Sequence, residues 1–278
     1  MCSLLIRWAD ILEEMPYRID LPHAGTNDFD RLVELGAIDV DVSGDGAIAA
    51  LMPDSVTPAE IASVLGLDDV PVSPARGRDD GSVWILRPRP IRIGRLRMVP
   101  ADARAEADAV RLIDAPAFGT GLHPTTALCL EALQDIVQIA VPHAVLDVGT
   151  GSGVLALAAL TIGVPRALGI DTDDGALRVA AENARINALD GRLQLRHGGP
   201  DTLTGTWPLV LANVLAAPLI EMAGSLVRCV GHQGELVLSG IPASLEREVD
   251  AAYNRLGMRR VRVNSRAGWV ALVLRASW

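Results

Sequence analysis

One glycine-rich stretch constrains the fold of this chain more than any other. Residues 145–155 read Val-Leu-Asp-Val-Gly-Thr-Gly-Ser-Gly-Val-Leu. A short apolar run rich in β-branched residues is typical of a buried parallel strand, and the Ala/Leu-rich stretch after it predicts a helix. Glycines allow backbone dihedrals that a Cβ would forbid. The pattern therefore predicts a strand–turn–helix unit whose turn approaches a ligand, with N–H groups at the helix start facing a polar group.

Strand and helix patterns alternate from residue 105 to the end of the chain, which predicts an α/β domain with a mostly parallel sheet covered on both faces. Residues 259–264 and 269–274 are separated by a short turn and should form an antiparallel hairpin at one edge. The expected strands are 144–148, 167–170, 193–196, 209–214 and 235–241, and the expected helices are 127–139, 154–162, 175–187, 218–230 and 245–256.

Residues 1–75 predict a small α+β domain in front of the sheet. We expect a strand at 17–21, a helix at 27–35, a hairpin formed by 37–42 and 47–52, and a helix from Thr57 to about Leu65 with the threonine hydroxyl as its cap. This segment carries 14 acidic residues against three arginines. Such a charge attracts a basic partner and repels nucleic acid, so we expect no direct sequence-specific nucleic acid binding.

Residues 76–104 have a different composition, with eight arginines against three acids and several prolines. The simpler interpretation is a solvated, partly extended linker. The alternative is a contact strip for an acidic surface or for RNA phosphates, formed by five arginines that no acid interrupts. These are Arg87, Arg89, Arg92, Arg95 and Arg97.

Several classes of protein are disfavoured. No apolar run approaches the roughly 20 residues that a membrane span needs, and the first 20 residues do not resemble a signal peptide. The three cysteines are far apart and fit neither a disulfide framework nor a zinc site, so we expect no metal. We interpret the protein as soluble and cytoplasmic.

Two carboxylates near the glycine turn indicate the kind of cofactor. Asp171 ends the next expected strand, 18 positions beyond Gly153, where a carboxylate can accept from both ribose hydroxyls; the alternative is a helix cap. Asp147 precedes the first glycine by two positions, and the glycines at 149, 151 and 153 depart from the G-x-G-x-x-G spacing of dinucleotide sites. A carboxylate there suits a cationic amino group, as in S-adenosyl-L-methionine, although it could also be a structural hydrogen-bond acceptor.

Asn213 ends another strand and should face the same crevice, because ligands of open sheets lie beyond the carboxyl ends of the strands. A neutral amide can accept from an amine without stabilising its protonated form; the alternative is a cap of the following helix. Residues 114–126, rich in Gly, Pro and hydroxyls, should place further donors at the ligand.

Five motifs in one order resemble the ribosomal protein L11 methyltransferase family. They are Phe-Gly-Thr-Gly-Leu-His-Pro-Thr-Thr at 118–126, the 147–153 turn, Asp171, Ala-Asn-Val-Leu at 212–215 and Leu-Ser-Gly-Ile at 238–241. Pro-Ile-Arg-Ile-Gly at 90–94 and the late Trp269 also match. The resemblance implies a class I methyltransferase (Rossmann-like) domain with a seven-stranded sheet at 105–278, behind a substrate-recognition domain.

The resemblance also implies S-adenosylmethionine-dependent methylation of lysine side chains and the α-amine of ribosomal protein L11, a basic protein substrate. Thr150 stands where a cysteine is common, and we expect this change to be harmless because the loop offers backbone there. Four positions fall where the family contacts its cofactor: Thr126, Gly149, Asp171 and Asn213. Phe118 and Thr120 fall in the loop that resembles the family's cofactor-covering segment. We add Asp147 and Gly151 of the turn to the cofactor-binding residues.

The sequence therefore predicts in-line transfer of a methyl group to an amine, with Asn213 positioning the amine. No dedicated general base stands out among Asp102, Asp108, Asp114 and His123, and His123 is more typical of a packing residue. Three alternatives stay open: a related lysine methyltransferase acting on another protein, such as an electron-transfer flavoprotein subunit; an NAD-binding oxidoreductase; and a ribosome-binding module without catalytic activity.

Overall fold

The computed structural model describes residues 17–22, 25, 27–37, 39–42, 47–53, 56–74, 90–115, 118–119, 123–266 and 268–278. The chain divides into two compact units, residues 1–87 and 88–278. No helix among these described residues is long and apolar enough to cross a membrane.

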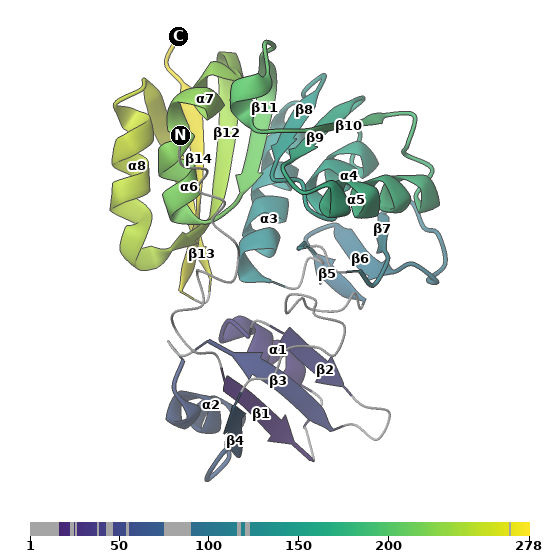
Figure 1. The fold of residues 1–278 in the computed structure, drawn as a ribbon, viewed down its shortest axis with the longest axis vertical. Coiled ribbons are helices and arrows are strands. Elements are labelled where there is room, and N and C mark those ends of the chain that lie inside the picture. Colours follow the sequence, from purple (N-terminus) through teal and green to yellow (C-terminus); the bar gives the residue numbers. More distant parts are fainter. Residues whose placement is uncertain are drawn as a thin grey trace. The chain divides into compact units, whose positions relative to one another are not determined.

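The front unit is a four-stranded antiparallel sheet with two helices, and its α+β character agrees with the expectation for this segment (Figure 1). The cap of its second helix is a full capping box, because the Thr57 hydroxyl accepts from the Glu60 N–H and the Glu60 carboxylate accepts from the Thr57 N–H. The order of the strands is β2-β3-β1-β4. The elements are β1 Tyr17–Leu21, α1 Asp28–Glu34, β2 Asp39–Val42, β3 Ile48–Met52, α2 Pro58–Leu65 and β4 Val72–Pro74.

The larger unit is built on a seven-stranded sheet in the order β10-β9-β8-β11-β12-β14-β13. Five strands are parallel, and β14 pairs antiparallel with both β12 and β13, so the predicted α/β class and the predicted C-terminal hairpin are confirmed. The strands are β8 Val145–Val148, β9 Ala167–Asp171, β10 Leu193–His197, β11 Trp207–Asn213, β12 Val230–Pro242, β13 Met258–Arg266 and β14 Trp269–Ala276.

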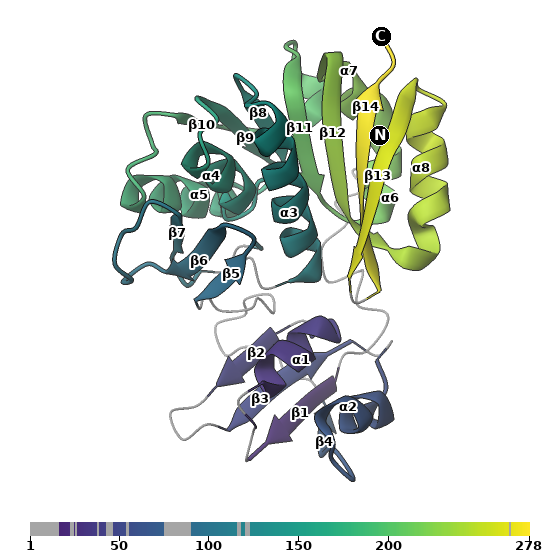
Figure 2. The ribbon, with the colours of Figure 1, turned by 180° about the vertical axis from the view of Figure 1, so that it is seen from behind.

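Both faces of this sheet are covered by helices. The hydrophobic core on one face includes α3 and α4, and the core on the other includes α6, α7 and α8 (Figures 1 and 2). One helix was predicted for 218–230, but Met222 leaves helical geometry and separates two short helices, with the poor helix formers Gly224 and Ser225 just beyond the break. The helices are α3 Pro124–Ile139, α4 Val154–Thr161, α5 Asp174–Ile186, α6 Ala216–Glu221, α7 Ala223–Arg228 and α8 Glu246–Asn254, with 3-10 turns at Pro200–Thr202 and Ala243–Leu245.

A separate three-stranded sheet precedes α3, where the sequence suggested the end of an extended linker. It consists of β5 Ile91–Ile93, β6 Leu96–Pro100 and β7 Ala109–Leu112. Ile93, Leu96 and Met98 are buried in the same core as α3 and α4, which is why this arginine-rich segment folds onto the larger unit. The part of the predicted linker at 75–89 lies outside the described residues.

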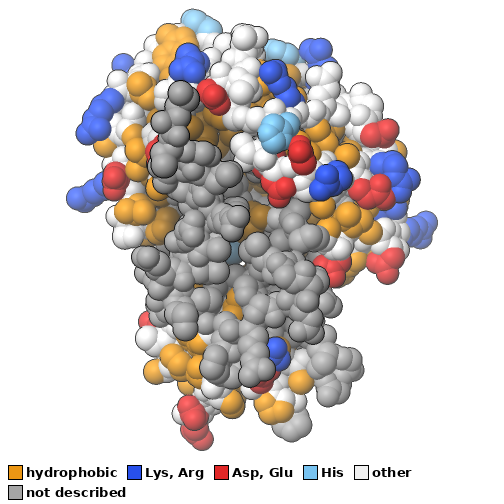
Figure 3. Space-filling view, in the orientation of Figure 1, with side chains coloured by type: hydrophobic (Ala, Val, Ile, Leu, Met, Phe, Trp, Pro, Cys, Tyr) orange, Lys and Arg blue, Asp and Glu red, His pale blue; other side chains and the backbone are white. Residues whose placement is uncertain are grey.

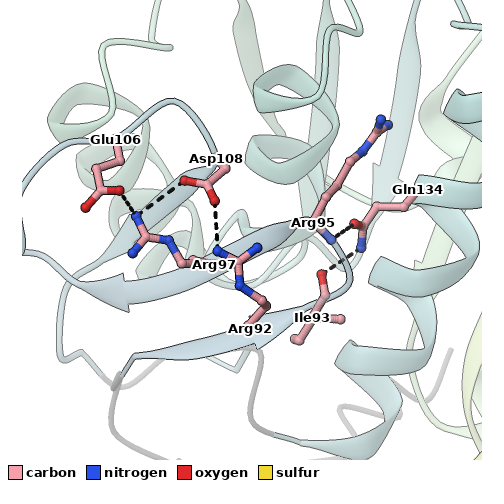
Figure 4. A network of polar contacts seen from close by, with 7 residues as sticks. All are labelled: Arg92, Ile93, Arg95, Arg97, Glu106, Asp108 and Gln134. Carbon is pink, nitrogen blue, oxygen red and sulfur yellow. Dashed lines mark hydrogen bonds and ion pairs between the residues drawn. The ribbon is translucent and has the colours of Figure 1, made fainter.

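Gln134 of α3 anchors the β5–β6 hairpin. Its side-chain amide donates to the carbonyl of Ile93 at 3.0 Å and accepts from the N–H of Arg95 at 2.8 Å (Figure 4). Gly94 lies between these two residues with φ +59°, and a Cβ there would lie only 2.6 Å from the Gln134 side-chain oxygen. The Pro-Ile-Arg-Ile-Gly motif is thus a turn shaped to fit against α3.

Candidate functional site

Side-chain alternation brings three polar residues to one face of neighbouring strands. Val145 of β8, Leu209 and Leu211 of β11, and Val237 of β12 belong to the core on the α3 side of the sheet. Because side chains of a strand point to the same face at every second residue, Asp147, Asn213 and Ser239 face the same way near the carboxyl ends of their strands. Their contacts agree, since Asn213 and Ser239 bond to the first turn of α3 and Asp147 to the first turn of α4.

Asp147 is completely buried. Its Oδ2 accepts from the Thr150 hydroxyl at 2.7 Å and from the Ala156 N–H at 3.2 Å, whereas its Oδ1 is buried with no hydrogen-bond partner among the described residues. Burial raises the pKa of Asp147 to about 7, although the Thr150 hydroxyl and the Ala156 amide act in the opposite direction. Oδ2 of Asp147 is therefore a structural hydrogen-bond acceptor, and Oδ1 remains available to a cation.

The N–H groups of the glycine turn all donate to groups within the protein, and of the amides at the start of the following helix, which were expected to face a polar group, that of Ala156 donates to Asp147. The amides of Gly149 and Thr150 both donate to the Ile170 carbonyl, at 2.9 and 3.0 Å, and those of residues 151–153 donate to Asp171, Phe118 and Thr150. All three glycines have positive φ, and a Cβ on Gly151 would lie 2.5 Å from the carbonyl oxygen of Phe118. The turn is shaped to pack closely rather than to bind an anion, which is unlike a pyrophosphate loop.

Asp171 lies at the carboxyl end of β9 and is partly exposed. One of its oxygens accepts from the Gly151 N–H at 2.9 Å and the other from the Asp173 N–H at 3.0 Å. The N-cap of α5 is Asp173, whose side chain accepts from the Gly175 N–H, so the alternative role of Asp171 as that cap is filled by another residue. A carboxylate has about four acceptor positions, so Asp171 retains capacity for further hydroxyl donors.

Asn213 has one satisfied and one unsatisfied side-chain atom. Its Nδ2 donates to Oγ1 of Thr126 at 3.2 Å, and its Oδ1 is buried without a partner among the described residues. Thr126 is itself fully buried in the first turn of α3. The cap alternative for Asn213 is not seen, because Leu215 occupies the N-cap position of α6 and no side chain caps that helix.

Gly240 connects two of the sequence motifs, Leu-Ser-Gly-Ile at 238–241 and Ala-Asn-Val-Leu at 212–215, because it packs against the backbone of the second. It has φ +84°, and the pairing of β12 with β14 shifts register between Leu238 and Ile241. A Cβ on Gly240 would lie 2.2 Å from the carbonyl oxygen of Val214, the residue after Asn213. The bulge in β12 thus leaves room for the backbone that carries Asn213.

Three aromatic rings line up beside the first turn of α3. His123 packs edge-on against Phe118 at 5.5 Å and against Trp269 at 5.2 Å between ring centroids. Its Nδ1 interacts with the Thr125 hydroxyl at 2.8 Å and caps α3, and burial lowers the pKa of His123 to about 4. The contacts of His123 are those of a packing and capping residue, and the lowered pKa makes its ring a weak proton acceptor. Thr120, also predicted here, lies outside the described residues.

Of the other candidate bases, Asp108 belongs to the small sheet. Asp108 forms ion pairs with Arg92 and Arg97, at 3.2 and 3.3 Å, and Arg97 also pairs with Glu106 (Figure 4). Asp102 and Asp114 are exposed, on either side of β7. Two of the arginines proposed as a contact strip are therefore neutralised within the small sheet, and Arg87 and Arg89 lie outside the described residues. On the face of the larger unit in Figure 3, basic and acidic side chains are interspersed.

Two residues of this site were missed by the sequence reasoning. Thr150 was expected to contribute only backbone, but its hydroxyl is bonded to Asp147. Ser239 was not predicted to have a role of its own, yet its buried hydroxyl donates to the Thr125 carbonyl at 3.0 Å and so links β12 to α3. The period of two along β12 was the signal that could have paired Ser239 with Asn213, its neighbour in the parallel ladder.

Known proteins provide the comparison for this geometry. The sequence profile of the family described as ribosomal protein L11 methyltransferase (PrmA) matches residues 67–277. The chain belongs to this family. A ribosomal protein L11 methyltransferase from Pelobacter propionicus is 37% identical over 212 residues, which cover 73% of this chain and 69% of that protein. One from Geobacter sulfurreducens is 38% identical, over 72% of this chain and 67% of its own length.

Among solved structures, a ribosomal protein L11 methylase from Lactobacillus delbrueckii subsp. bulgaricus superposes with a TM-score of 0.62 at 27% identity. The match covers 67% of this chain and 98% of that one. The fold is therefore that of a methyltransferase, and family membership disfavours the oxidoreductase and the non-enzymatic alternatives.

Proposed function

We propose that this chain is an S-adenosyl-L-methionine-dependent protein N-methyltransferase that methylates lysine side chains, the α-amine, or both, of ribosomal protein L11. The observation that carries the proposal is the pair of buried oxygens without partners, Asp147 Oδ1 and Asn213 Oδ1. Both lie near the carboxyl ends of neighbouring parallel strands, where ligands of such sheets bind. Buried polar atoms of native proteins are almost always paired, so two orphans in one place indicate a missing ligand.

The residues fit the proposed cofactor group by group. Asp147 Oδ1 would accept from the cofactor's ammonium group, and the partly exposed Asp171 would accept from its ribose hydroxyls. Gly149, Gly151 and Thr126 would line the backbone side of the site, and Phe118 and Thr120 would belong to the segment that covers it. The bound cofactor would supply a methyl group on a positively charged sulfur.

Asn213 is the residue we assign to the substrate amine. Transfer forms a nitrogen–carbon bond as the carbon–sulfur bond breaks, and it requires the neutral amine, whose lone pair attacks. The Asn213 amide would accept one N–H of this amine and orient the lone pair, without the bias toward an ammonium ion that a carboxylate would create. The row of Phe118, His123 and Trp269 would exclude water from the amine. The surplus proton leaves to solvent after transfer.

The names of the relatives favour ribosomal protein L11 as substrate over a flavoprotein subunit. We assign substrate recognition to the front unit, residues 1–75, whose excess of acids suits a basic protein. The chain spans about two thirds of the length of these curated relatives, and the family match lies mainly in the larger unit.

The test is methyl transfer from radiolabelled S-adenosyl-L-methionine to purified ribosomal protein L11, with an electron-transfer flavoprotein as the competing substrate and with whole lysate as a third arm. We expect label in ribosomal protein L11. Asn213→Ala should lower kcat by about 100-fold with little change in cofactor affinity, whereas Asp171→Ala should weaken cofactor binding by at least about tenfold. Absence of cofactor binding in calorimetry would refute the cofactor assignment, and label in another protein alone would refute the substrate.

A further inference from the structure

Thr150 lies in the glycine turn, and its side chain points toward Asp147. The hydroxyl is buried and donates to Asp147 Oδ2 at 2.7 Å, while the Ala156 N–H approaches the same oxygen at 3.2 Å. Both donors bind one oxygen of the carboxylate, so the other oxygen, Oδ1, is left free. The bond therefore sets which oxygen remains for a ligand.

Gly169 gives the hydroxyl its space. It faces Asp147 across the β8–β9 ladder, and a Cβ there would lie 2.8 Å from Thr150 Oγ1. Any larger residue at 169 would push the hydroxyl away from the carboxylate. The glycine of the Gly-Ile-Asp motif and the threonine of the turn thus form one arrangement around Asp147.

The electrostatic setting makes this hydroxyl important. No arginine pairs with Asp147 among the described residues, and the nearest titratable groups are Asp171 on β9 and Cys129 on α3. Asp171 disfavours a second negative charge, and the Cys129 thiol stays neutral because burial raises its pKa. Helix α4 contributes only apolar residues and a threonine. Hydrogen bonds from Thr150 and Ala156 are therefore what favours ionisation of Asp147 before any ligand binds.

We propose that Thr150 is a positioning residue of the cofactor site: its hydroxyl holds Asp147 as a carboxylate with Oδ1 free for the ammonium group of the cofactor. This inference rests on the proposed function, and it adds a coupling between cofactor binding and proton release. Where the carboxyl is protonated in the free protein, binding must expel that proton, so affinity falls as the pH is lowered. Thr150 sets the pH at which this happens.

The experiment is calorimetry of S-adenosyl-L-methionine binding to the full chain from pH 6 to 9, in buffers of different ionisation enthalpy to count released protons. The variants are Thr150→Val, which keeps the shape and loses the donor; Thr150→Ser, which keeps the donor; and Thr150→Cys, a weaker donor. We expect Thr150→Val to bind about tenfold to a hundredfold more weakly at pH 7, with the deficit shrinking toward pH 9, and to release more protons on binding.

Thr150→Ser should restore the wild-type pH profile, and Thr150→Cys should lie between the two. The unliganded proteins give a second measurement, because the infrared carbonyl band of a protonated carboxyl, assigned by its loss in Asp147→Asn, should grow in Thr150→Val at pH 7. A folded Thr150→Val protein with the wild-type pH profile and proton count would overturn the inference; if that variant does not fold, wild-type values in Thr150→Cys would do so. Failure of the wild-type protein to bind at any pH would instead refute the proposed cofactor.

Discussion

Replacing Gly240 with alanine tests how the bulge in β12 holds the strand end that carries Asn213. An L-residue in the left-handed region costs about 1–2 kcal/mol for the backbone alone. The added Cβ would also lie 2.2 Å from the carbonyl oxygen and 2.6 Å from the carbonyl carbon of Val214. These are backbone atoms, so the strand end that carries Asn213 must move. Overpacking of this kind adds about 1–3 kcal/mol, which gives a total loss of about 2–5 kcal/mol.

Gly163→Ala is the matched control in the same unit. Gly163 also has positive φ, at +110°, but nothing lies within 4 Å of the position of its Cβ. In a unit of this size we expect the melting temperature to fall by about 2–8 °C in the control and by about 4–20 °C in Gly240→Ala. At saturating cofactor the control should keep its methyl transfer rate, whereas Gly240→Ala should lose about 100-fold, because a shift of about 1 Å at Asn213 is enough.

The reasoning fails if Gly240→Ala is folded, as stable as the control and fully active, because the Val214 carbonyl would then have moved without consequence. Loss of stability with unchanged kcat would show that the bulge supports the sheet and not the position of Asn213. Circular dichroism at the assay temperature separates a displaced residue from an unfolded fraction.

Three further predictions concern single buried groups. Burial raises the pKa of Asp147 to about 7 from 3.8, so the folded state binds this proton more tightly than the unfolded chain. The wild-type free energy of unfolding should therefore decrease by up to about 4 kcal/mol as the pH rises from about 4 to about 7. Urea titrations of Asp147→Asn should lack this pH-dependent part. Tyr253→Phe removes a buried O–H that donates to the Leu219 carbonyl at 2.7 Å, and the urea midpoint should drop by the equivalent of about 1–3 kcal/mol; an unchanged midpoint would contradict a structural role. Gln134→Ala removes both side-chain bonds to the β5–β6 hairpin, so hydrogen exchange of residues 91–100 should become faster while β8 keeps its protection; equal protection in both proteins would show that the hairpin is held by its apolar side chains alone.

The parts of the fold with a clear hydrophobic periodicity could be predicted from the sequence. The glycine turn, the parallel strands and the final hairpin all have apolar runs of the right length, and Thr57 carries a complete cap signal. The β5–β6 hairpin was missed because prolines and arginines dominate its composition, although Ile91, Ile93, Leu96 and Met98 alternate as in a strand with one buried face. There, burial of one face outweighed composition.

The placement of the candidate residues was predictable, but their bonding was not. Asp147, Asp171 and Asn213 were expected near the ends of strands, and they lie near the carboxyl ends of the neighbouring strands β8, β9 and β11. Nothing in the sequence indicated that Asp171 accepts the Gly151 N–H or that Thr150 uses its hydroxyl, because these bonds depend on where the turn folds back in three dimensions. The bonding of the turn amides was unpredictable for the same reason, because the backbone carbonyls of Ile170 and Phe118 that accept from them come from other parts of the chain.

The attachment of the β5–β6 hairpin to Gln134 has a consequence for how such proteins can diversify. Gln134 holds this hairpin to α3, and residues 88–278 form a compact unit of their own, so the strand end that carries Asn213 belongs to a unit that begins just before Pro90. If the front unit recognises the target, as proposed, a different recognition module could be joined upstream while the residues of the methyl-transfer site stay unchanged. A chimaera exchanged at Pro90 is the natural starting point for redirecting the proposed activity.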